Sequence, residues 1–564
     1  MKKTLTSMAA LGMACVMVLT GCGGGNTAET EPQTIGAPTT EAPAETEAET
    51  ENAEPTGAQE LTFVLNNEPD SLDPSYTNNS FASPFLTNLF EGLVTYDENG
   101  ELAPGNAESW ESNEDMTVYT FHLRDGLKWS DGSPLTASDY VYSALHVMTP
   151  ATTSQYVNMM TDYIVNGQEY YDGTATAEEV GVKALDDTTI EYTLKQPTPF
   201  FADVASMWVY APVQEATVEA NGDKWSTAAD TYVCNGPFKV SEINMGESVV
   251  LTKNENYWNA ENVTLEKLTF RYILDLSTAL TAYENGEVDG VRNIPAGDIA
   301  RLKAENAGTH TANVYGTVYY NINCQAEPYT DPLVRKALNL AIDRESLINN
   351  VAQLDAQPAY SILAPGYVVD GKDILEGRSE FEMSPNANVE AAQAALAEAG
   401  YPGGEGFPTL KLSFYSDDTV KKVAEALKEM WETNLGITVE VTSAEWAVFY
   451  SEVQSGNYEV AAMGWSADYV NPMSFLPLLV TGDVTNTSFY SNSEYDAMVE
   501  QVKVESDPAK FGELVKAADD LASSEYPVIP LYYKADTYLL KDYVSGVYMD
   551  SSTHLFFKNA KVNK

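Results

Sequence analysis

The chain has 564 residues, a formal net charge of −52 at pH 7 and a hydrophobic content of 44%. This excess of acidic residues opposes contact with nucleic-acid phosphates, so we expect no nucleic-acid partner. About 500 residues follow the N-terminal segments, which is too many for one hydrophobic core and predicts two or three domains.

The first 22 residues have the three zones of an export signal. Lys2 and Lys3 provide a positive start, Leu5 to Leu19 is mostly apolar, and the run ends in "LTGC". The run is too short to span a bilayer. Its ending resembles a bacterial lipobox, which implies that Cys22 is lipidated and holds the protein at a membrane surface. An ordinary signal followed by a chance cysteine is the alternative.

Residues 23–60 consist mainly of Glu, Ala, Thr, Pro and Gly. They contain nine Glu and no Lys or Arg. Such a composition cannot bury enough apolar surface to form a core, and the like charges extend the chain. We therefore expect a disordered acidic tether between the lipid anchor and the folded body.

Short strands and turns dominate the first half of the folded body. Tyr119, Phe121 and Leu123 alternate with polar residues, which predicts a half-buried strand. Thr136 precedes a helix with Asp139 at its third position, close to a capping box. Turn residues within alternating segments predict three hairpins, in residues 93–104, 184–201 and 236–258.

The second half alternates helices with strands. Asp331 is expected to cap a helix whose first residue is Pro332. The strand–helix–strand order of 409–443 predicts a βαβ unit with parallel strands. The next strand, 458–465, is apolar on both faces, as a central parallel strand is. Ligands of open α/β sheets bind beyond the carboxyl ends of such strands, and Asp468 lies there.

The sequence does not contain the residue patterns that are typical of enzyme active sites. The four His are scattered without metal-ligand spacing, no Ser lies in a nucleophile elbow, and no glycine loop fits a phosphate. We therefore expect no enzyme activity, no catalytic residue, no metal site and no cofactor. Cys234 and Cys324 could form a disulfide outside the cytoplasm, or could be isolated core residues.

Seven segments resemble the extracytoplasmic solute-binding proteins of peptide ABC transporters (family 5, the oligopeptide- and dipeptide-binding group). They are "EPDSLDP" (68–74), "LFEGLVTYDENGELAPGNAESW" (89–110), "YTFHLRDGLKWSDGSPLTASDYVYS" (119–143), "NGPFKV" (235–240), "NENYWN" (254–259), "DPLVRKALNLAIDRE" (331–345) and "GWSADYVNPMSFL" (464–476). The resemblance implies an α/β fold of the periplasmic-binding-protein type II-like class, in which two lobes joined by a hinge close over the ligand and carry an extra domain.

The resemblance also implies how the chain divides. We expect the first lobe to combine 61–105, 190–275 and 533–564. Residues 106–189 would form the extra domain, and 276–532 the second lobe.

In oligopeptide-binding members, the acid of the segment that matches "GWSADY" holds the peptide's α-ammonium group, and here that acid is Asp468. Backbone groups near Glu68 and from Gly464 to Ser466 are expected to bind the peptide as an added strand. Trp446 and Trp465 would line side-chain pockets. The alternatives are structural: Asp468 pairs with a base or orders the next turn, and the two tryptophans are core residues.

The sequence departs from the family where the other end of the peptide would bind. Val420 and Ala462 stand where some members have basic residues for the C-terminal carboxylate of short peptides. Lys534 stands where an aromatic residue is common. Either longer peptides bind, or Lys534 supplies the missing charge; a solvated surface lysine is the alternative.

The implied function is that of an exported lipoprotein on the outer face of the cell membrane, or on its periplasmic side. It would capture extracellular oligopeptides and deliver them to an ABC permease, and we expect a monomer. Domain closure replaces a chemical reaction, because a ligand stabilises the state that it binds better. Two rivals use the same fold: a receptor for a non-peptide solute such as a sugar or a nickel complex, and a peptide sensor without transport.

Overall fold

The computed structural model describes residues 57–369 and 372–564. Cys22, the export signal and most of the acidic tether lie outside these residues. The main feature is a mixed sheet of eleven strands in the order β17–β16–β18–β12–β19–β11–β1–β10–β9–β8, with β13 beside β19. Its strands are β1 (Glu60–Leu65), β8 (Phe238–Asn244), β9 (Ser248–Lys253), β10 (Lys267–Tyr272), β11 (Gly290–Arg292), β12 (Thr309–Ile322), β13 (Gln357–Pro358), β16 (Leu410–Tyr415), β17 (Val439–Ala444), β18 (Val460–Ser466) and β19 (Val528–Leu540).

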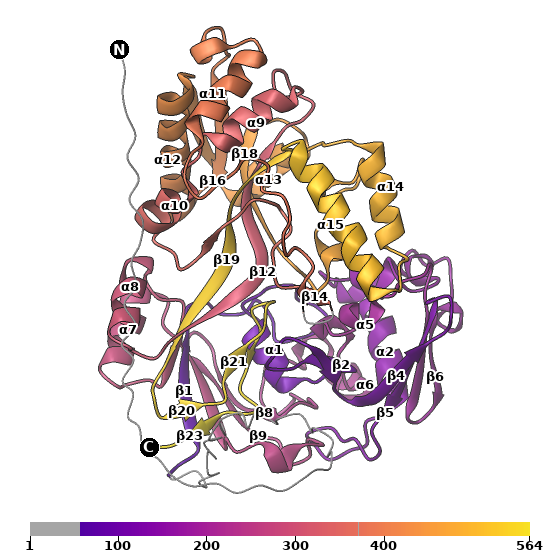
Figure 1. Cartoon of the computed structure of the whole chain (residues 1–564). Coiled ribbons are helices and arrows are strands. Elements are labelled where there is room, and N and C mark those ends of the chain that lie inside the picture. Colours follow the sequence, from indigo (N-terminus) through magenta and orange to yellow (C-terminus); the bar gives the residue numbers. More distant parts are fainter. Residues whose placement is uncertain (1–56, 370–371) are drawn as a thin grey trace, which may run out of the picture. The chain divides into compact units, whose positions relative to one another are not determined.

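The long strands β12 and β19 lie side by side and belong to both halves of this sheet (Figure 1). In one half β12 pairs with β18, and in the other half β19 pairs with β11. The β12–β19 register shifts between Asn313 and Thr317, so the regular ladder is interrupted between the two halves. A hinge between the lobes is therefore expected at this interruption.

The first half of the sheet is built on β1, which pairs in parallel with β10 and β11. Helices α7 (Leu276–Glu284) and α8 (Ala296–Ala304) pack in one apolar cluster with Val64 of β1 and Leu539 of β19. The expected lobe boundary at residue 276 would separate both helices from the strands β1 and β19 on which they pack. We propose instead that the second lobe begins within β12.

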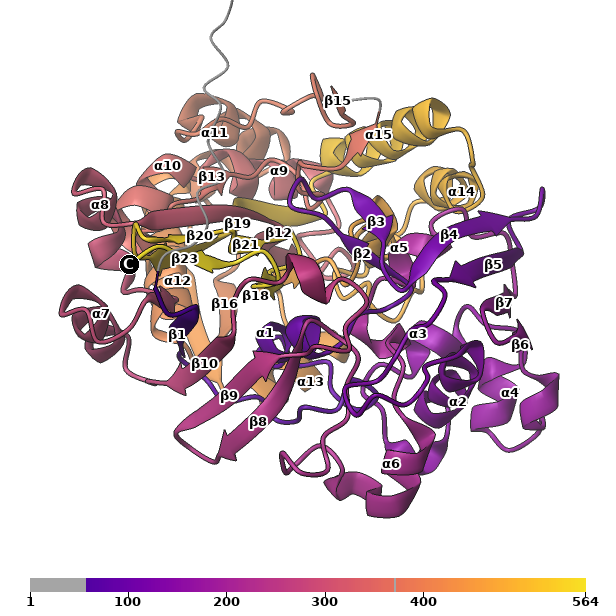
Figure 2. The same ribbon diagram turned by 90° about the horizontal axis from the view of Figure 1, so that it is seen from below.

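The extra domain contains a separate antiparallel sheet in the order β4–β5–β7–β6, seen at the right of Figure 2. Helix α2 (Ala137–Val147) packs on it. Tyr119, Phe121 and Leu123 are buried, as predicted. The predicted capping box is confirmed, since the Thr136 amide donates to Asp139 Oδ2 at 2.8 Å. The strands are β4 (Ala107–Ser112), β5 (Val118–Leu123), β6 (Val182–Asp186) and β7 (Thr189–Thr193).

The second half of the sheet contains the predicted βαβ unit. Strands β16 and β17 pair in parallel and are connected by α12 (Asp418–Leu435). The prediction that the next strand is a central parallel one is wrong in part: β18 is parallel to β16 but antiparallel to β12. The reason is that β12 enters from the first lobe in the opposite direction.

Several local predictions are confirmed. The three hairpins are β2–β3, β6–β7 and β8–β9. Asp331 caps α9, since its side chain accepts from the Leu333 amide at 2.8 Å. Cys234 and Cys324 are both free. Further elements are β2 (Val94–Tyr96), β3 (Leu102–Pro104), α1 (Ser83–Leu89), α5 (Phe201–Val204), α9 (Pro332–Leu340), α11 (Val389–Glu398), α13 (Trp446–Gln454), α14 (Ser493–Val502) and α15 (Pro508–Ser524).

The helices of residues 57–369 and 372–564 are too short or too polar to span a membrane.

Candidate ligand-binding site

The segment that follows β18 is held in place by backbone hydrogen bonds. The Ala467 amide donates to the Tyr315 carbonyl of β12 at 2.8 Å. The Asp468 amide donates to Ser474 Oγ at 3.0 Å. Asp468 therefore projects from a fixed position at the carboxyl end of β18, as the strand pattern predicted.

Asp468 lines a cavity of about 430 Å³. Its carboxylate accepts one hydrogen bond, from Tyr156 Oη to Oδ1 at 3.2 Å. Among residues 57–369 and 372–564, no basic group lies within 4.0 Å of this carboxylate. Arg292 also lines the cavity, but its guanidinium pairs with Asp536 at 3.0 Å. Pairing with a base, one of the alternative roles for Asp468, is thus not observed.

The electrostatic state of Asp468 follows from this setting. Burial raises the pKa of its carboxyl to about 6, and the hydrogen bond from Tyr156 opposes that rise only in part. The charged form has lost water without gaining a cationic partner. A cation that enters the cavity would form a charge-assisted hydrogen bond with this carboxylate, which is stronger than a neutral one.

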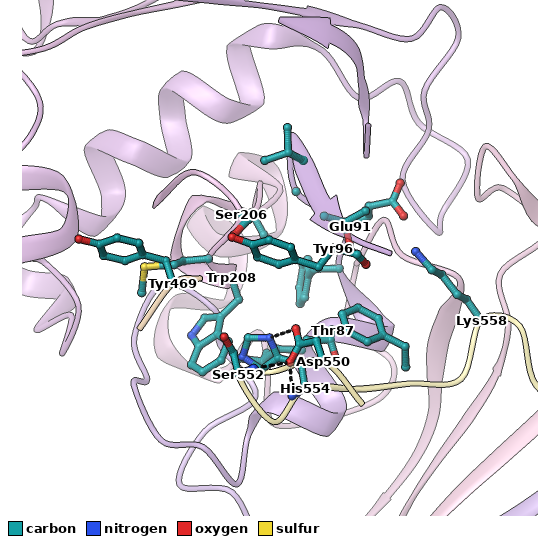
Figure 3. Close-up of a pocket in the computed structure, with 18 of the residues that line it drawn as sticks. Thr87, Glu91, Tyr96, Ser206, Trp208, Tyr469, Asp550, Ser552, His554 and Lys558 are labelled. Atoms are coloured by element: carbon teal, nitrogen blue, oxygen red, sulfur yellow. Dashed lines mark hydrogen bonds and ion pairs between the residues drawn. The ribbon is translucent and has the colours of Figure 1, made fainter. Parts of the chain in front are cut away.

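Asp468 also lines a smaller pocket of about 50 Å³, and Figure 3 shows part of the lining of this pocket. The rings of Trp208 and His554 meet edge to face, with centroids 5.4 Å apart. His554 Nδ1 lies 2.9 Å from Asp550 Oδ2. Both rings also line the larger cavity, so the C-terminal segment forms one of its walls.

Sequence reasoning missed the residues that face Asp468 from elsewhere in the chain. They come from distant segments, and no local motif connects them to "GWSADY". His554 was noted only as one of four scattered histidines. These residues are Tyr156, Trp208, Arg292 and His554.

The outer edge of β18 is open where the predicted ligand-binding backbone lies. On one side β18 pairs with β12 from Val460 through Ser466. On the other side β16 pairs only with Val460 and Ala461. From Ala462 onward, the backbone groups on that side pair with no strand of the described chain. Such an edge accepts an extended peptide as an added strand.

The structure brings Lys534 to the residues at the end of β18. Its Nζ donates to Ser466 Oγ at 2.8 Å. The side chain is half-buried, and burial lowers the pKa of its ammonium to about 8. The ammonium thus has a hydrogen-bond partner on β18, and its role toward a ligand stays a prediction.

The other predicted site residues have different surroundings. Trp446 is 51% exposed and stacks on Tyr450 with ring centroids 5.2 Å apart, so it is not a core residue. Trp465 is partly buried, and its Nε1 donates to Ser474 Oγ at 3.5 Å. Glu68 is exposed in the loop after β1 and does not line the Asp468 cavity.

Two further positions matter for the carboxylate end of a ligand. Val420 is half-buried in the first turn of α12, and Ala462 is buried in β18. Neither brings a charge to the site. Residues 57–369 and 372–564 contain no cluster of three or more His, Cys, Asp or Glu that could hold a metal ion.

The model of bacterial extracellular solute-binding proteins, family 5 Middle, matches residues 101–487. The chain belongs to this family. Family 5 proteins are extracellular by this description, and they bind solutes.

Individual family 5 proteins match nearly the whole chain. The oligopeptide-binding protein OppA of Bacillus subtilis is 33% identical over 89% of this chain and 93% of its own length. The periplasmic oligopeptide-binding protein OppA of Salmonella typhimurium is 35% identical over 90% of this chain and 93% of its own. Among solved structures, Haemophilus influenzae OppA in complex with the peptide RPPGFSPFR matches with a TM-score of 0.71 and 30% identity. It covers 91% of this chain and 100% of that one. The expected periplasmic-binding-protein type II-like fold is thereby confirmed.

Proposed function

We propose that this family 5 protein captures extracellular oligopeptides and delivers them to an ABC permease. One observation carries the proposal: a desolvated carboxylate without a basic partner, Asp468, lies at the end of a strand whose outer edge is open. An oligopeptide has a matching group for each feature: an α-ammonium group for the carboxylate and an extended backbone for the strand edge. The relatives named as oligopeptide-binding proteins support this choice of solute.

In this mechanism the α-ammonium group binds Asp468, and the first peptide residues pair with the backbone from Gly464 to Ser466. Recognition through the backbone tolerates many side chains, which suits a transporter of mixed peptides. Trp465 and Trp446 would contact peptide side chains, and the segment around Glu68 would contact the backbone from the first lobe.

Closure of the lobes follows from the position of the cavity. Ser466 and Asp468 come from the second lobe, whereas Trp208 and Arg292 come from the first. A peptide in the cavity would touch both sides and so stabilise the closed state relative to the open one. We propose that this closure is the only event that the protein performs and that no peptide bond is cleaved.

The cellular setting is also part of the proposal. Lipidation of Cys22 would hold a monomer at the outer face of the membrane. The acidic tether of residues 23–60 would give the receptor its reach toward the permease.

The decisive experiment compares two peptides that differ only at the N-terminus. Affinities of the purified protein for an alanine-rich pentapeptide and for its N-acetylated form are measured by calorimetry. Acetylation is expected to weaken binding by roughly 2–3 kcal/mol, because it leaves a buried carboxylate unpaired. In Asp468→Asn the free amine has no such partner, so acetylation should make little difference.

Equal affinity of the wild-type protein for both peptides would reject the role of Asp468. Mass spectrometry of ligands released from the purified protein tests the solute class. Recovery of sugars or metal complexes without peptides would reject the proposed function.

A further inference from the structure

Lys534 is a cation without an anionic partner next to the ligand strand. Its ammonium has one hydrogen bond, to Ser466 Oγ at 2.8 Å. Among residues 57–369 and 372–564, no carboxylate lies within 4.0 Å of Nζ. The neighbouring cation Arg378 contrasts with it, since its guanidinium lies 3.6 Å from the buried carboxylate of Asp519.

The Lys534 side chain passes over two glycines, and it lies tight against one of them, Gly316. A Cβ atom on Gly316 of β12 would lie 2.8 Å from the Trp465 carbonyl oxygen and 3.0 Å from Lys534 Cδ, whereas one on Gly464 of β18 would lie at an ordinary contact distance of 3.6 Å from Cε. Neither glycine has a positive φ, so backbone conformation does not require glycine at either position. The missing side chain of Gly316 leaves space for the lysine stem to cross β12, which brings its ammonium from β19 to the end of β18.

The charge thereby lies at the end of the strand that leads to the acid that we assign to the α-ammonium group, although Lys534 and Asp468 line different cavities. Ser466, the partner of Lys534, precedes Asp468 by two residues. β18 ends at Ser466, and two residues of chain span at most about 6–7 Å of backbone. A peptide whose amine binds Asp468 therefore places its first two residues beside the Lys534 ammonium.

We propose that Lys534 is a specificity-determining residue that favours peptides with a carboxylate close to the N-terminus. The carboxylate is that of an Asp or Glu side chain in the first two residues, or the C-terminal carboxylate of a dipeptide. This inference rests on the proposed function, because the amine at Asp468 sets the register.

Physical considerations favour a ligand carboxylate over solvent as the partner of this cation. Burial disfavours the charged ammonium, as its lowered pKa indicates, and an opposite charge from the ligand relieves that cost. The whole chain carries a formal charge of −52, which repels acidic peptides at a distance. A local cation is then needed for an acidic peptide to bind well.

The test uses peptide pairs that differ by one charge. Affinities for Ala-Glu-Ala-Ala-Ala and Ala-Gln-Ala-Ala-Ala are measured by calorimetry at about 0.15 M salt, where long-range repulsion is screened. The wild-type protein is expected to prefer the Glu peptide about tenfold, the scale of one partly desolvated ion pair. Lys534→Met should lose this preference, and Lys534→Arg should retain most of it.

A second pair, Ala-Ala and its C-terminal amide, identifies the source of the carboxylate. A preference in this pair alone assigns Lys534 to the C-terminus of dipeptides, and a preference in the first pair assigns it to an acidic side chain. Lys239→Met is the matched control, because Lys239 lies in β8 and pairs with Glu255 at 2.6 Å. This variant should behave like the wild-type protein.

The wild-type measurements need no variant, so a folding defect in Lys534→Met cannot hide the result. Absence of any preference in both pairs overturns the inference, as does an unchanged preference in a folded Lys534→Met. Failure of the proposed function looks different: none of the unacetylated peptides would bind in a manner that depends on Asp468.

Discussion

Asp468 shows how one residue acquires a function from neighbours far away in the chain. Its position after an apolar strand could be read from the sequence, and the resemblance supplied a ligand group for it. Its hydrogen-bond donor, Tyr156, is 312 residues away in sequence. The raised pKa follows from that packing, so no local pattern could have predicted it.

The pH dependence of peptide binding tests this electrostatic state. Burial raises the pKa of Asp468 to about 6, so below pH 6 the carboxyl is protonated and binding of an ammonium group must displace a proton. Affinity is expected to rise up to tenfold per unit as the pH increases toward about 6 and to level off above it. It should fall again when the peptide amine loses its proton near pH 8.

Titration calorimetry from pH 4.5 to 9 checks this profile. Asp468→Asn provides the comparison, because its amide does not titrate and its affinity should stay low and flat over the acidic limb. A wild-type affinity that does not change between pH 5 and 7 would contradict the assignment.

At the scale of elements, the long strands β12 and β19 set the geometry of the site. β12 pairs with β18 on one side and with β19 on the other. Ser466 of β18 and Lys534 of β19 are thereby brought together. The βαβ unit, the hairpins and the helix caps were predictable because local spacing determines them. The β12–β19 pairing was not, since it joins segments about two hundred residues apart and leaves no periodic signal.

Gly308, at the start of β12, offers a test of this pairing. It has φ +73°, and a Cβ atom there would lie 1.8 Å from the Leu540 carbonyl of β19. Gly286 has a similar φ of +77° but open space around it. Gly308→Ala is therefore expected to lower the free energy of unfolding by roughly 2–4 kcal/mol, and Gly286→Ala by only about 1 kcal/mol.

Urea denaturation of both variants measures the difference. The Gly286 variant isolates the backbone strain, so the excess loss in Gly308→Ala reports the contact between the two strands. Equal losses in the two variants would mean that the strands separate easily at this end.

At the scale of the whole described chain, a second set of contacts joins the segment after β18 to the first lobe and extra domain. Tyr163 Oη lies 3.2 Å from Tyr469 Oη, and Phe200 stacks on Tyr469 with centroids 5.9 Å apart. Asp203 accepts hydrogen bonds from Tyr96 Oη at 3.1 Å and from Asn471 Nδ2 at 3.3 Å. We call this set of contacts the seam. It lies beside the segment that contains Asp468, so its strength should influence opening of the lobes.

The seam should weaken as the pH rises. Burial raises the pKa of Asp203 to about 7, so the folded protein holds this proton more tightly than the unfolded chain does. The resulting stabilisation is complete at low pH and is lost as the pH increases through about 7. Asp203→Asn is expected to be more stable than wild type at pH 8 by roughly 1–3 kcal/mol, and by much less at pH 5.

Thermal denaturation at both pH values checks this, with the exposed Asp187→Asn as a control for the loss of one negative charge. Since wild type and variant share every other acidic group, only the difference between them is interpreted. A difference that is the same at pH 5 and pH 8 would exclude titration of Asp203 as its cause.

By itself, the sequence determined the family, the α/β class, the hairpins, the capped helices and the place of Asp468 at the end of a strand. These features depend on residue spacing and on motifs a few residues long. The tertiary structure decided the rest: the mixed pairing of β18, the packing of α7 and α8 against β1 and β19, and the free state of both cysteines. It also decided that Lys534 reaches Ser466 over two glycines. The physical reason is that burial and long-range pairing set the charge and the partners of a side chain, and both arise only when distant segments pack together.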